Sequence, residues 1–332
     1  MKTILYHHHL LRSIYMVPLV AGLVAAPVAT HSQEKPSAAD ATTATADEDA
    51  GIFDYESEAE PPLFDDPAPA IDALKTALAA NDFDGVAKLL GLDAKKLKEG
   101  DDAMETFTQI RDAAAKKVVI VDTEEGKILQ LGDKLWPFPF PILKGDDGKW
   151  AFDTQAGLEE IVNRRVGENE LEAIATMRQY VEAQKDYASE DRDEDGVEEF
   201  AQKLVSSSGA TDGLYWPANQ GSGESPAGEF LDQAEFKDAS EGEGYFGYRF
   251  RILAGQGDKV AGGAYDYVTN GNMIGGFGLI AWPVKYGETG VNTFAVNQHG
   301  IVYQIDLGPS TETIAQYIDR FNPDDSWKVV ND

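Results

Sequence analysis

The sequence lacks cysteine altogether and contains only five histidines among 332 residues. Without thiols, the protein can form no disulfide bond, cysteine nucleophile or lipid-modified cysteine, so its stability must come from packing or a bound metal. Four of the histidines lie within residues 1–32, and His299 is the fifth. One imidazole without a thiol cannot build a Cys-His pair or a multi-histidine zinc site, which excludes most hydrolases that pair a nucleophile with a base.

The sequence also lacks an apolar run long enough for a firm membrane anchor. The N-terminal run covers residues 14–29, contains two prolines, and follows Lys2 and Arg12 with no acidic residue before it. A spanning helix needs about 20 apolar residues. We therefore predict that residues 1–32 are a secretory signal peptide removed on export, with a membrane anchor as the alternative. The mature chain would be periplasmic or secreted, without a stable membrane span, and we interpret the export as bacterial.

Basic residues are scarce, because 28 Lys and Arg stand against 58 Asp and Glu, a net charge of −30. Loss of residues 1–32 would remove Lys2 and Arg12 and no acid, which leaves 26 basic residues against 58 acidic ones and a net charge of −32. A surface of this sign repels nucleic acid and anionic lipid headgroups, so neither is an expected partner. It suits metal cations or basic partners, and solubility alone is the alternative explanation.

The composition divides the remaining chain into a spacer and two α+β domains. Residues 33–65 are acidic and poor in apolar side chains, so we predict a disordered acidic spacer. In the N-terminal domain, 66–165, Asp66 is expected to cap a first helix. Asn81 or Asp82 is expected to cap a second helix. Three helices are then followed by the strand patterns "KVVIVDT", "KILQLGD" and "PFPILK…GKWAFDT". Helices ahead of a curved antiparallel sheet predict an α+β domain.

The second domain, 166–332, is predicted to pack one long helix on an antiparallel sheet. Asn169 and Glu172 form a capping-box pattern at the expected start of that helix. A short helix, "VEEFAQKLVS", should follow, and then strands in "GYFGYRFRILAG", "GAYDYVTNGNMIGGFGLIAWP", "GVNTFAVNQHG" and "IVYQIDLG". Asn270-Gly271 and His299-Gly300 indicate tight hairpins. A final helix is expected from Ser310, with Ile314, Tyr317, Ile318 and Phe321 facing inward.

Parts of the chain resemble known families. The order "ALAANDFDGVAKLLG" then "GKWAFDT" resembles the nuclear-transport-factor-2-like fold. The helix "AQKDYASEDRDEDGVEEFAQKL" before "GYRFRI" and "GFGLIAWPVKYGETGVNTFAVNQHGIVYQ" is similar to the soluble heads of type IV pilins and pseudopilins, without their apolar membrane stem. From about Phe64 to Val330 the chain also resembles a bacterial family of uncharacterised secreted proteins, domain-of-unknown-function family 2950, through "WPFPFPI", "WAFDTQAGLEEIVNRRVGENELEAI", "DGLYWP", "GYRFRIL", "GGAYDYVTNGNMIGGFGLIAWPVKYG" and "GIVYQIDLGP". That resemblance implies no established activity.

The stretch "YASEDRDEDG" places Asp191, Asp193 and Asp195 at alternating positions before a glycine that permits a sharp bend. Calcium takes six to eight oxygen ligands, and an Asp-x-Asp-x-Asp-Gly turn gathers three carboxylates around one point. Glu199 falls at the ninth position of such a loop, but Gln202 replaces the final glutamate of an EF-hand. We predict a structural calcium site formed by Asp191, Asp193, Asp195 and Glu199. The alternative is a solvated acidic turn in which Asp195 caps a following helix.

No other motif identifies a catalytic or cofactor-binding residue. "GEGYFG", residues 242–247, matches the glycine pattern of dinucleotide-binding loops, but a strand is expected where that loop needs a helix. His299 lies in an expected turn and is interpreted as a surface residue. Aromatic residues near glycines and prolines could stack on sugars, clasp a peptide or fill the core under irregular loops. They are Tyr215, Trp216, Tyr265, Tyr267, Trp282 and Tyr286.

These observations predict an exported, acidic, two-domain α+β protein of the bacterial envelope. The leading function is a non-enzymatic binding or assembly module for an envelope protein or polymer, with calcium as the expected cofactor. One alternative is a carboxylate-based hydrolase acting on an envelope polymer, because paired acids can carry glycosidase-type chemistry. Spacing selects no such pair among 58 acidic residues. Another alternative is a calcium-stabilised structural component.

Overall fold

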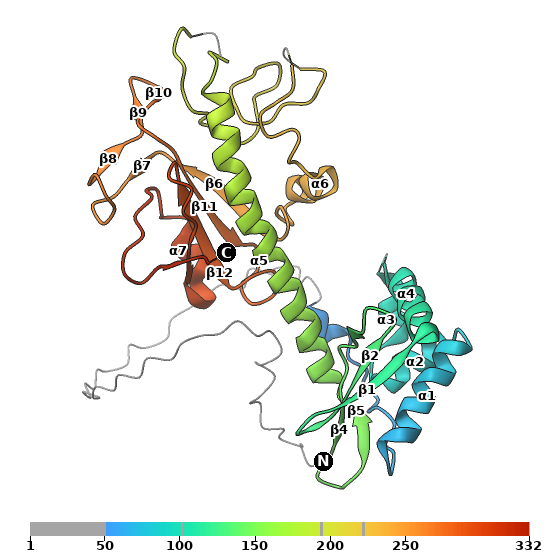
Figure 1. The fold of residues 1–332 in the computed structure, drawn as a ribbon. Coiled ribbons are helices and arrows are strands. Elements are labelled where there is room, and N and C mark those ends of the chain that lie inside the picture. The colour runs from blue at the N-terminus through green and yellow to red at the C-terminus, as the bar shows by residue number, and fades with distance from the viewer. Residues whose placement is uncertain (1–50, 101, 193–194, 221–222, 332) are drawn as a thin grey trace, which may run out of the picture. The chain divides into compact units, whose positions relative to one another are not determined.

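The structure, a computed structural model, describes residues 51–331 except 101, 193–194 and 221–222. The predicted signal peptide, most of the predicted spacer and Asp193 therefore lie outside the described residues. The described chain belongs to one compact unit built from helices and antiparallel strands (Figure 1). The α+β class expected from the sequence is confirmed. No helix in the described ranges is both long enough and apolar enough to cross a membrane.

The first half of the described chain places helices before a small antiparallel sheet, as the sequence predicts. The strand order is β1-β2-β4-β5, and β3 pairs with β2. One core joins the helices to the sheet through residues such as Leu74, Leu129 and Phe152. The elements are η1 (Ile52–Tyr55), α1 (Pro67–Ala79), α2 (Phe83–Leu89), α3 (Ala94–Glu99), α4 (Ala103–Lys116), β1 (Val118–Asp122), β2 (Gly126–Leu131), β3 (Trp136–Pro137), β4 (Ile142–Lys144) and β5 (Trp150–Phe152).

Aspartate caps set the starts of α1 and α2. Asp66 accepts a hydrogen bond from the Ala68 N–H at 3.0 Å, and Asp82 accepts one from the Gly85 N–H at 2.9 Å. Each cap satisfies one of the amide groups that a first helical turn leaves without a partner. Both caps are predicted from the sequence, and both are confirmed.

Residues 51–65 differ from the predicted spacer, because they are packed against the first half of the chain. The Asp93 N–H donates to the carbonyl of Tyr55 at 2.8 Å. Phe64 and Trp150 exchange two backbone hydrogen bonds of 2.8 and 2.7 Å, so Phe64 extends the sheet beyond β5. The side chains of Ile52 and Phe64 also pack against the first core, so a few apolar residues and main-chain pairing anchor a segment whose overall composition is acidic.

Helix α5 (Thr154–Tyr187) begins well before the predicted cap at Asn169. Asp153 caps it by accepting a backbone hydrogen bond at 2.8 Å. The predicted cap is wrong because Asn169 lies inside the helix, where its side-chain amide donates to the carbonyl of Thr289 at 2.9 Å. The predicted domain boundary between residues 165 and 166 also falls within α5.

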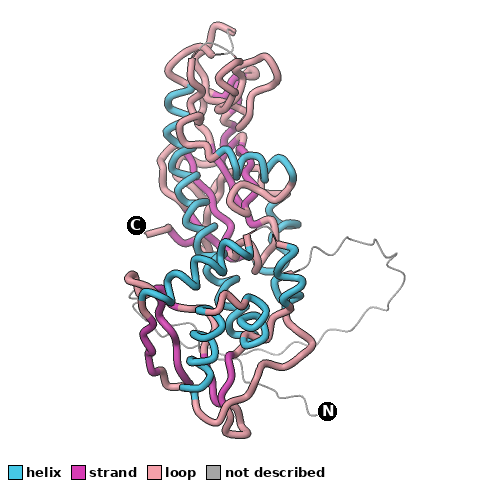
Figure 2. The backbone as a smooth tube through the Cα atoms, turned by 90° about the vertical axis from the view of Figure 1, so that its right-hand side faces the viewer, coloured by secondary structure: helices cyan, strands magenta, loops and turns pink. Residues whose placement is uncertain are grey.

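The second sheet lies along α5 (Figures 1 and 2) and has the strand order β14-β13-β12-β11-β6. One face packs Leu279 and its neighbours against Met177 of α5, and the opposite face packs Ile280 near Phe321. The elements are α6 (Gln233–Glu241), β6 (Tyr248–Leu253), β7 (Gly255–Gln256), β8 (Tyr265–Asp266), β9 (Val268–Thr269), β10 (Asn272–Met273), β11 (Gly278–Pro283), β12 (Asn292–Asn297), β13 (Tyr303–Asp306), η2 (Gly308–Ser310), α7 (Thr311–Ala315) and β14 (Lys328–Val329).

The two predicted hairpins have different outcomes. Strands β9 and β10 are joined by Asn270-Gly271, with φ of 56° and 99°, so this tight turn is confirmed. At the second position, Gly300 also has a positive φ of 75°. However, β12 and β13 already pair Ala295 with Tyr303, so the connection is a longer loop.

Two expected helices are changed by tertiary hydrogen bonds. The predicted helix over residues 197–206 is absent, because backbone groups along it bond to distant segments: the Phe200 N–H donates to the Met273 carbonyl at 2.9 Å. The final helix is reduced to α7, and the prediction that Ile314 and Tyr317 face inward is wrong, since these residues are 40% and 81% exposed. The guanidinium of Arg251 accounts for the early end, because it donates to three carbonyls at residues 315–318.

Candidate ligand-binding pocket

The predicted calcium loop folds back on itself through its first aspartate. Asp191 accepts hydrogen bonds from the N–H groups of Asp195 and Gly196 at 3.2 and 2.9 Å. Asp195 accepts from the Val197 N–H at 2.8 Å and from the Asn272 side chain at 2.7 Å. The alternative in which Asp195 caps a helix is wrong, because no helix follows it.

Glu199, the fourth predicted calcium ligand, is directed toward β10. It is 7% exposed, and its carboxylate accepts hydrogen bonds from the Met273 N–H and from the Gln202 side chain. Among the described residues, no three or more His, Cys, Asp or Glu side chains form a group able to hold a metal ion, so Asp191, Asp195 and Glu199 are not gathered into one. Because Asp193 is outside the described part of the chain, the calcium site stays a prediction.

The structure also places His299 and the glycine pattern at residues 242–247, for which the sequence predicted no catalytic or cofactor-binding role. His299 is exposed, as predicted, and its N–H donates to the Asn297 side chain at 3.1 Å. Residues 242–247 connect α6 to β6, so a helix precedes the glycine pattern and a strand follows it. This is the reverse of a dinucleotide-binding loop, and the prediction against one is consistent with the fold.

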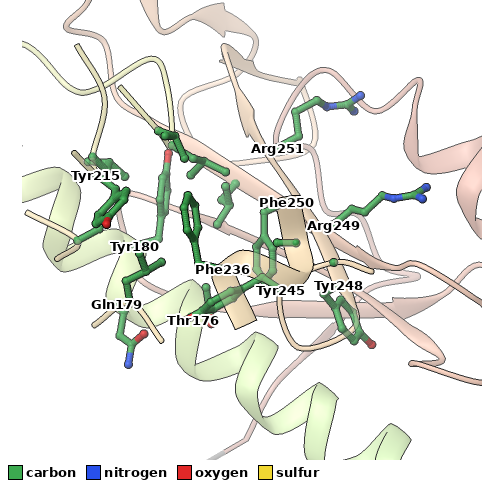
Figure 3. A pocket seen from close by; sticks show the side chains of 18 of the residues that line it. Thr176, Gln179, Tyr180, Tyr215, Phe236, Tyr245, Tyr248, Arg249, Phe250 and Arg251 are labelled. Atoms are coloured by element: carbon green, nitrogen blue, oxygen red, sulfur yellow. The ribbon is translucent and has the colours of Figure 1, made fainter. Parts of the chain in front are cut away.

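A pocket with a volume of about 560 Å³ lies between α5, α6 and strand β6 (Figure 3). Four residues of α5 line it at helical spacing, namely Thr176, Gln179, Tyr180 and Ala183. Because residues at these intervals share one face of a helix, a single strip of α5 forms one wall. The other walls come from Leu204, Val205, Leu214, Tyr215, Ala227, Phe230 and Leu231 before α6, Phe236 and Ala239 on α6, Gly242, Gly244 and Tyr245 after it, Tyr248, Arg249, Phe250 and Arg251 on β6, and Leu279 and Trp282 on β11.

Aromatic contacts hold the wall around α6. The rings of Tyr215 and Phe236 lie 5.2 Å apart, and those of Tyr245 and Phe250 lie 6.3 Å apart. Such ring pairs add to the stability gained from burial. The hydroxyl of Tyr245 accepts a hydrogen bond from the Asp232 N–H at 3.0 Å, which ties the loop after α6 to the start of that helix.

The interior of the pocket offers few polar groups. The hydroxyl of Tyr180 is already occupied, because it donates to the Gly278 carbonyl at 3.1 Å and accepts from Gln184 at 3.0 Å. Arg249 pairs with Glu312 at 2.7 Å, and Arg251 bonds to carbonyls near the end of α7. Both arginines point away from the aromatic side chains that Figure 3 labels, and the guanidinium of Arg251 lies over the ring of Trp282, 5.4 Å from its centre. The lining includes no Asp, Glu or His, so the site is suited to an uncharged, apolar ligand.

Burial raises the pKa values of three tyrosines that line this pocket, Tyr180, Tyr245 and Tyr248. Burial raises the pKa of Tyr180 well above its usual value. Burial also raises the pKa of Tyr245, the hydrogen bond from the Asp232 N–H opposes this rise, and the carboxylates of Asp232, Glu235 and Glu172 add to it. A negative potential therefore acts at the Tyr245 side of the pocket, although no acidic side chain lines its interior.

Sequence reasoning identified part of this aromatic set. Tyr215 and Trp282 were singled out, and both line the pocket. Trp216 and Tyr267 are instead buried in the core beneath the loops, which was the alternative given for them. Other lining aromatics were missed, namely Tyr180, Phe230, Phe236, Tyr245, Tyr248 and Phe250. The run "YFGYRF" is the one local signal that could have revealed three of them.

Comparison with known proteins gives a family without a function. No curated protein matches the chain, and no solved structure matches it either. One family model matches residues 62–330, which covers α1 through β14 and therefore both sheets and the pocket. The chain belongs to the family described as protein of unknown function, DUF2950.

Proposed function

We propose that this protein is a non-enzymatic binding module that takes an apolar ligand into the pocket between α5, α6 and β6. The observation that carries the proposal is a cavity of about 560 Å³ whose walls are aromatic and aliphatic. Ligand sites of small molecules and peptides are commonly apolar clefts of about 300–1,000 Å³ with few polar groups. The pocket is also built by segments distant in sequence, so its shape depends on the complete fold of the second half.

A pocket-filling substitution tests the proposal directly. Ala239 lies on α6 and lines the pocket, so Ala239→Trp should fill it from a partly exposed position without entering the main core. N-phenyl-1-naphthylamine, an uncharged fluorophore that brightens in apolar surroundings, is the probe. We expect saturable binding to the native chain and at least about tenfold weaker binding to the variant.

Ala234→Trp is the matched control, because Ala234 is an exposed residue of the same helix and does not line the pocket. Circular dichroism of both variants checks that the fold is retained. The proposal fails if the native chain does not bind the fluorophore, or if the two variants bind it equally well.

The alternative, a carboxylate-based hydrolase, finds no support in this pocket. Hydrolysis of a glycosidic bond needs two carboxyl groups placed on either side of that bond. The lining contains no Asp or Glu. The binding proposal is therefore the one that the geometry favours.

We extend the proposal to an exported protein of the bacterial envelope with a structural calcium ion at Asp191, Asp193, Asp195 and Glu199. The acidic composition and the predicted signal peptide support this extension. A nuclear-transport-factor-2-like first half and a pilin-head-like second half are part of the same proposal, supported by the order of helices and strands.

A further inference from the structure

The outer edge of β6 sends half of its main-chain groups away from the sheet. Within the described chain, β6 is the last strand of the second sheet and pairs there with β11. Alternate residues of an antiparallel strand bond to opposite sides. The Val284 N–H donates to the Gly247 carbonyl at 3.0 Å, which assigns the odd-numbered residues to the β11 side. The N–H and C=O groups of Tyr248, Phe250 and Ile252 therefore point outward.

Other parts of the chain close this outward edge at both ends and leave its middle open. Tyr248 exchanges two hydrogen bonds with Tyr245 at 2.8 and 3.1 Å, and the Tyr267 N–H donates to the Ala254 carbonyl at 2.8 Å. No hydrogen bond within the described residues reaches the outward groups of Phe250 and Ile252. Two donors and two acceptors in a row are a template for an added strand.

The pocket borders this open stretch. Four consecutive strand residues line it, namely Tyr248, Arg249, Phe250 and Arg251. Because their side chains alternate between the two faces of the sheet, the cavity follows the edge of the strand and not one face alone. A residue added opposite Phe250 would place its side chain on the same face as Phe250, where Tyr180 and Phe236 form the walls (Figure 3).

The segment beside the opening is strongly acidic. Residues 232–243 contain Lys237 as their one basic side chain and five acidic ones, Asp232, Glu235, Asp238, Glu241 and Glu243. Two of these acids, with Glu172 of α5, act on the hydroxyl of Tyr245 at the pocket. Basic residues on either side of an apolar segment would complement this charge.

We propose that the pocket captures an extended peptide segment of another protein, with alternating apolar side chains and basic flanks, which adds as a strand to the open edge of β6. The proposal rests on the proposed binding function, because the same pocket receives the side chains. Main-chain hydrogen bonds to Phe250 and Ile252 would fix the register, and the aromatic walls would select apolar side chains.

A synthetic peptide with the sequence KKVFVFVKK, blocked at both ends, tests this proposal with the full chain. We expect it to bind, to displace N-phenyl-1-naphthylamine, and to slow hydrogen exchange at the Phe250 and Ile252 amides. Ile120 of β1 is the internal reference, since it lies on the outer strand of the first sheet and does not line the pocket. Its exchange should stay unchanged.

Two modified peptides distinguish the contribution of main-chain hydrogen bonds to binding from the contribution of the basic flanks. N-methylation of the two phenylalanines removes edge hydrogen bonds and should weaken binding at least about fivefold. The counterpart EEVFVFVEE keeps the apolar segment and should bind about tenfold more weakly in low salt, with the difference shrinking as salt is added. Equal affinities of the methylated and unmodified peptides would overturn strand addition.

A substitution in the protein also tests strand addition, because it removes one of the hydrogen-bonding groups of the open edge. Ile252→Pro removes an outward N–H, does not alter the pocket lining, and keeps the bonds to β11, because proline is tolerated where its nitrogen faces away from a sheet. It should lose peptide affinity about fivefold while still binding the naphthylamine, and Ile252→Val should behave like the native chain. If the native chain binds the naphthylamine but not the lysine-flanked peptide, the strand-addition proposal is wrong and the proposed apolar binding function is retained. If the native chain binds neither, both proposals are wrong.

Discussion

The β5 edge of the first sheet and the β6 edge of the second sheet differ in how other segments of the chain cover them. Beyond β5, Phe64 forms two backbone hydrogen bonds with Trp150, so a segment of the same chain covers this edge of the first sheet at Trp150. Beyond β6, internal partners reach Tyr248 and Ala254 but leave Phe250 and Ile252 open beside an apolar pocket. The chain thus pairs its own residues with both of these edges, and the stretch that it leaves open at β6 borders a pocket. A partial cover that stops at a cavity indicates a place for a partner.

The buried aromatics differ between the sheets as well. The first sheet, residues 118–152, contains no tyrosine, and its core is built from Leu, Ile, Val and Phe with Trp150 at the side. The second sheet buries Tyr180, Tyr248 and Tyr267 against its strands. A purely apolar core suits a structural role, whereas phenol rings combine an apolar body with a group that ionises in alkali.

Alkaline pH should produce the largest difference between the sheets. Burial raises the pKa of Tyr180 and Tyr248, and it raises that of Tyr267 to about 12. Because the folded chain holds these protons more tightly than the unfolded chain, their contribution to stability is complete below pH 10 and is lost as the pH rises through the folded-state values. Each unit of such a shift corresponds to about 1.4 kcal/mol.

Hydrogen exchange measured from pH 8 to 11.5 checks this expectation, after correction for the intrinsic rate. Amides of β6 and β11 should lose protection before those of β1 and β2. Tyr180→Phe should reduce the alkaline loss, whereas Tyr317→Phe should not, because Tyr317 is 81% exposed. Simultaneous loss in both sheets would erase the proposed contrast.

Removing the cover of β5 should have a smaller effect. Phe64→Pro deletes the N–H that bonds to the Trp150 carbonyl and trims a ring that packs on the first core. The free energy of unfolding should fall by about 1–3 kcal/mol, as measured by urea denaturation. Leu63→Ala is the control, since Leu63 is 57% exposed and should change stability little. If both variants are as stable as the native chain, Phe64 contributes no more than a surface residue.

Calcium should give the smallest effect, confined to the second half of the chain, because Asp195 and Glu199 contact β10, which pairs with β9. Calcium at 10 to 100 times its dissociation constant would stabilise the fold by about 1.4–2.7 kcal/mol, visible as a melting temperature higher by a few degrees. Asp191→Asn should abolish the rise. Asp147→Asn, in a turn of the first sheet, should preserve it. Identical melting in chelator and in millimolar calcium would remove calcium from the proposal.

Local signals in the sequence predicted the features that depend on neighbouring residues. Asp66 and Asp82 cap helices because a cap needs only the first turn that follows it, and Asn270-Gly271 forms a hairpin because positive φ is a property of those two residues. The same reasoning misplaced the start of α5, because Asp153 begins the helix earlier and Asn169 bonds to a segment 120 residues away.

The candidate site was largely hidden from the sequence for the same physical reason. Its walls come from α5, the loops around α6, β6 and β11, which meet only after folding. Residues 197–206 show how a distant contact overrides a local pattern. Their sequence pattern predicts a helix, but the Ala201 N–H donates a hydrogen bond to the Gln184 side chain at 2.8 Å, which holds this segment in a loop. The calcium loop gave the opposite case, because its pattern is clear while its described members are not gathered into one group.

The pocket lining contains no Asp, Glu or His, which are the side chains that ordinarily change charge between pH 4 and 7. An uncharged ligand held there would be retained through mild acidification, because no side chain that lines the cavity would gain or lose a proton. Exchange would instead depend on a competing apolar segment or on ions that screen the acidic segment at α6. Uptake and release of an uncharged ligand would then follow the supply of competitors, whereas a ligand with basic flanks would also respond to salt and to protonation of that acidic segment.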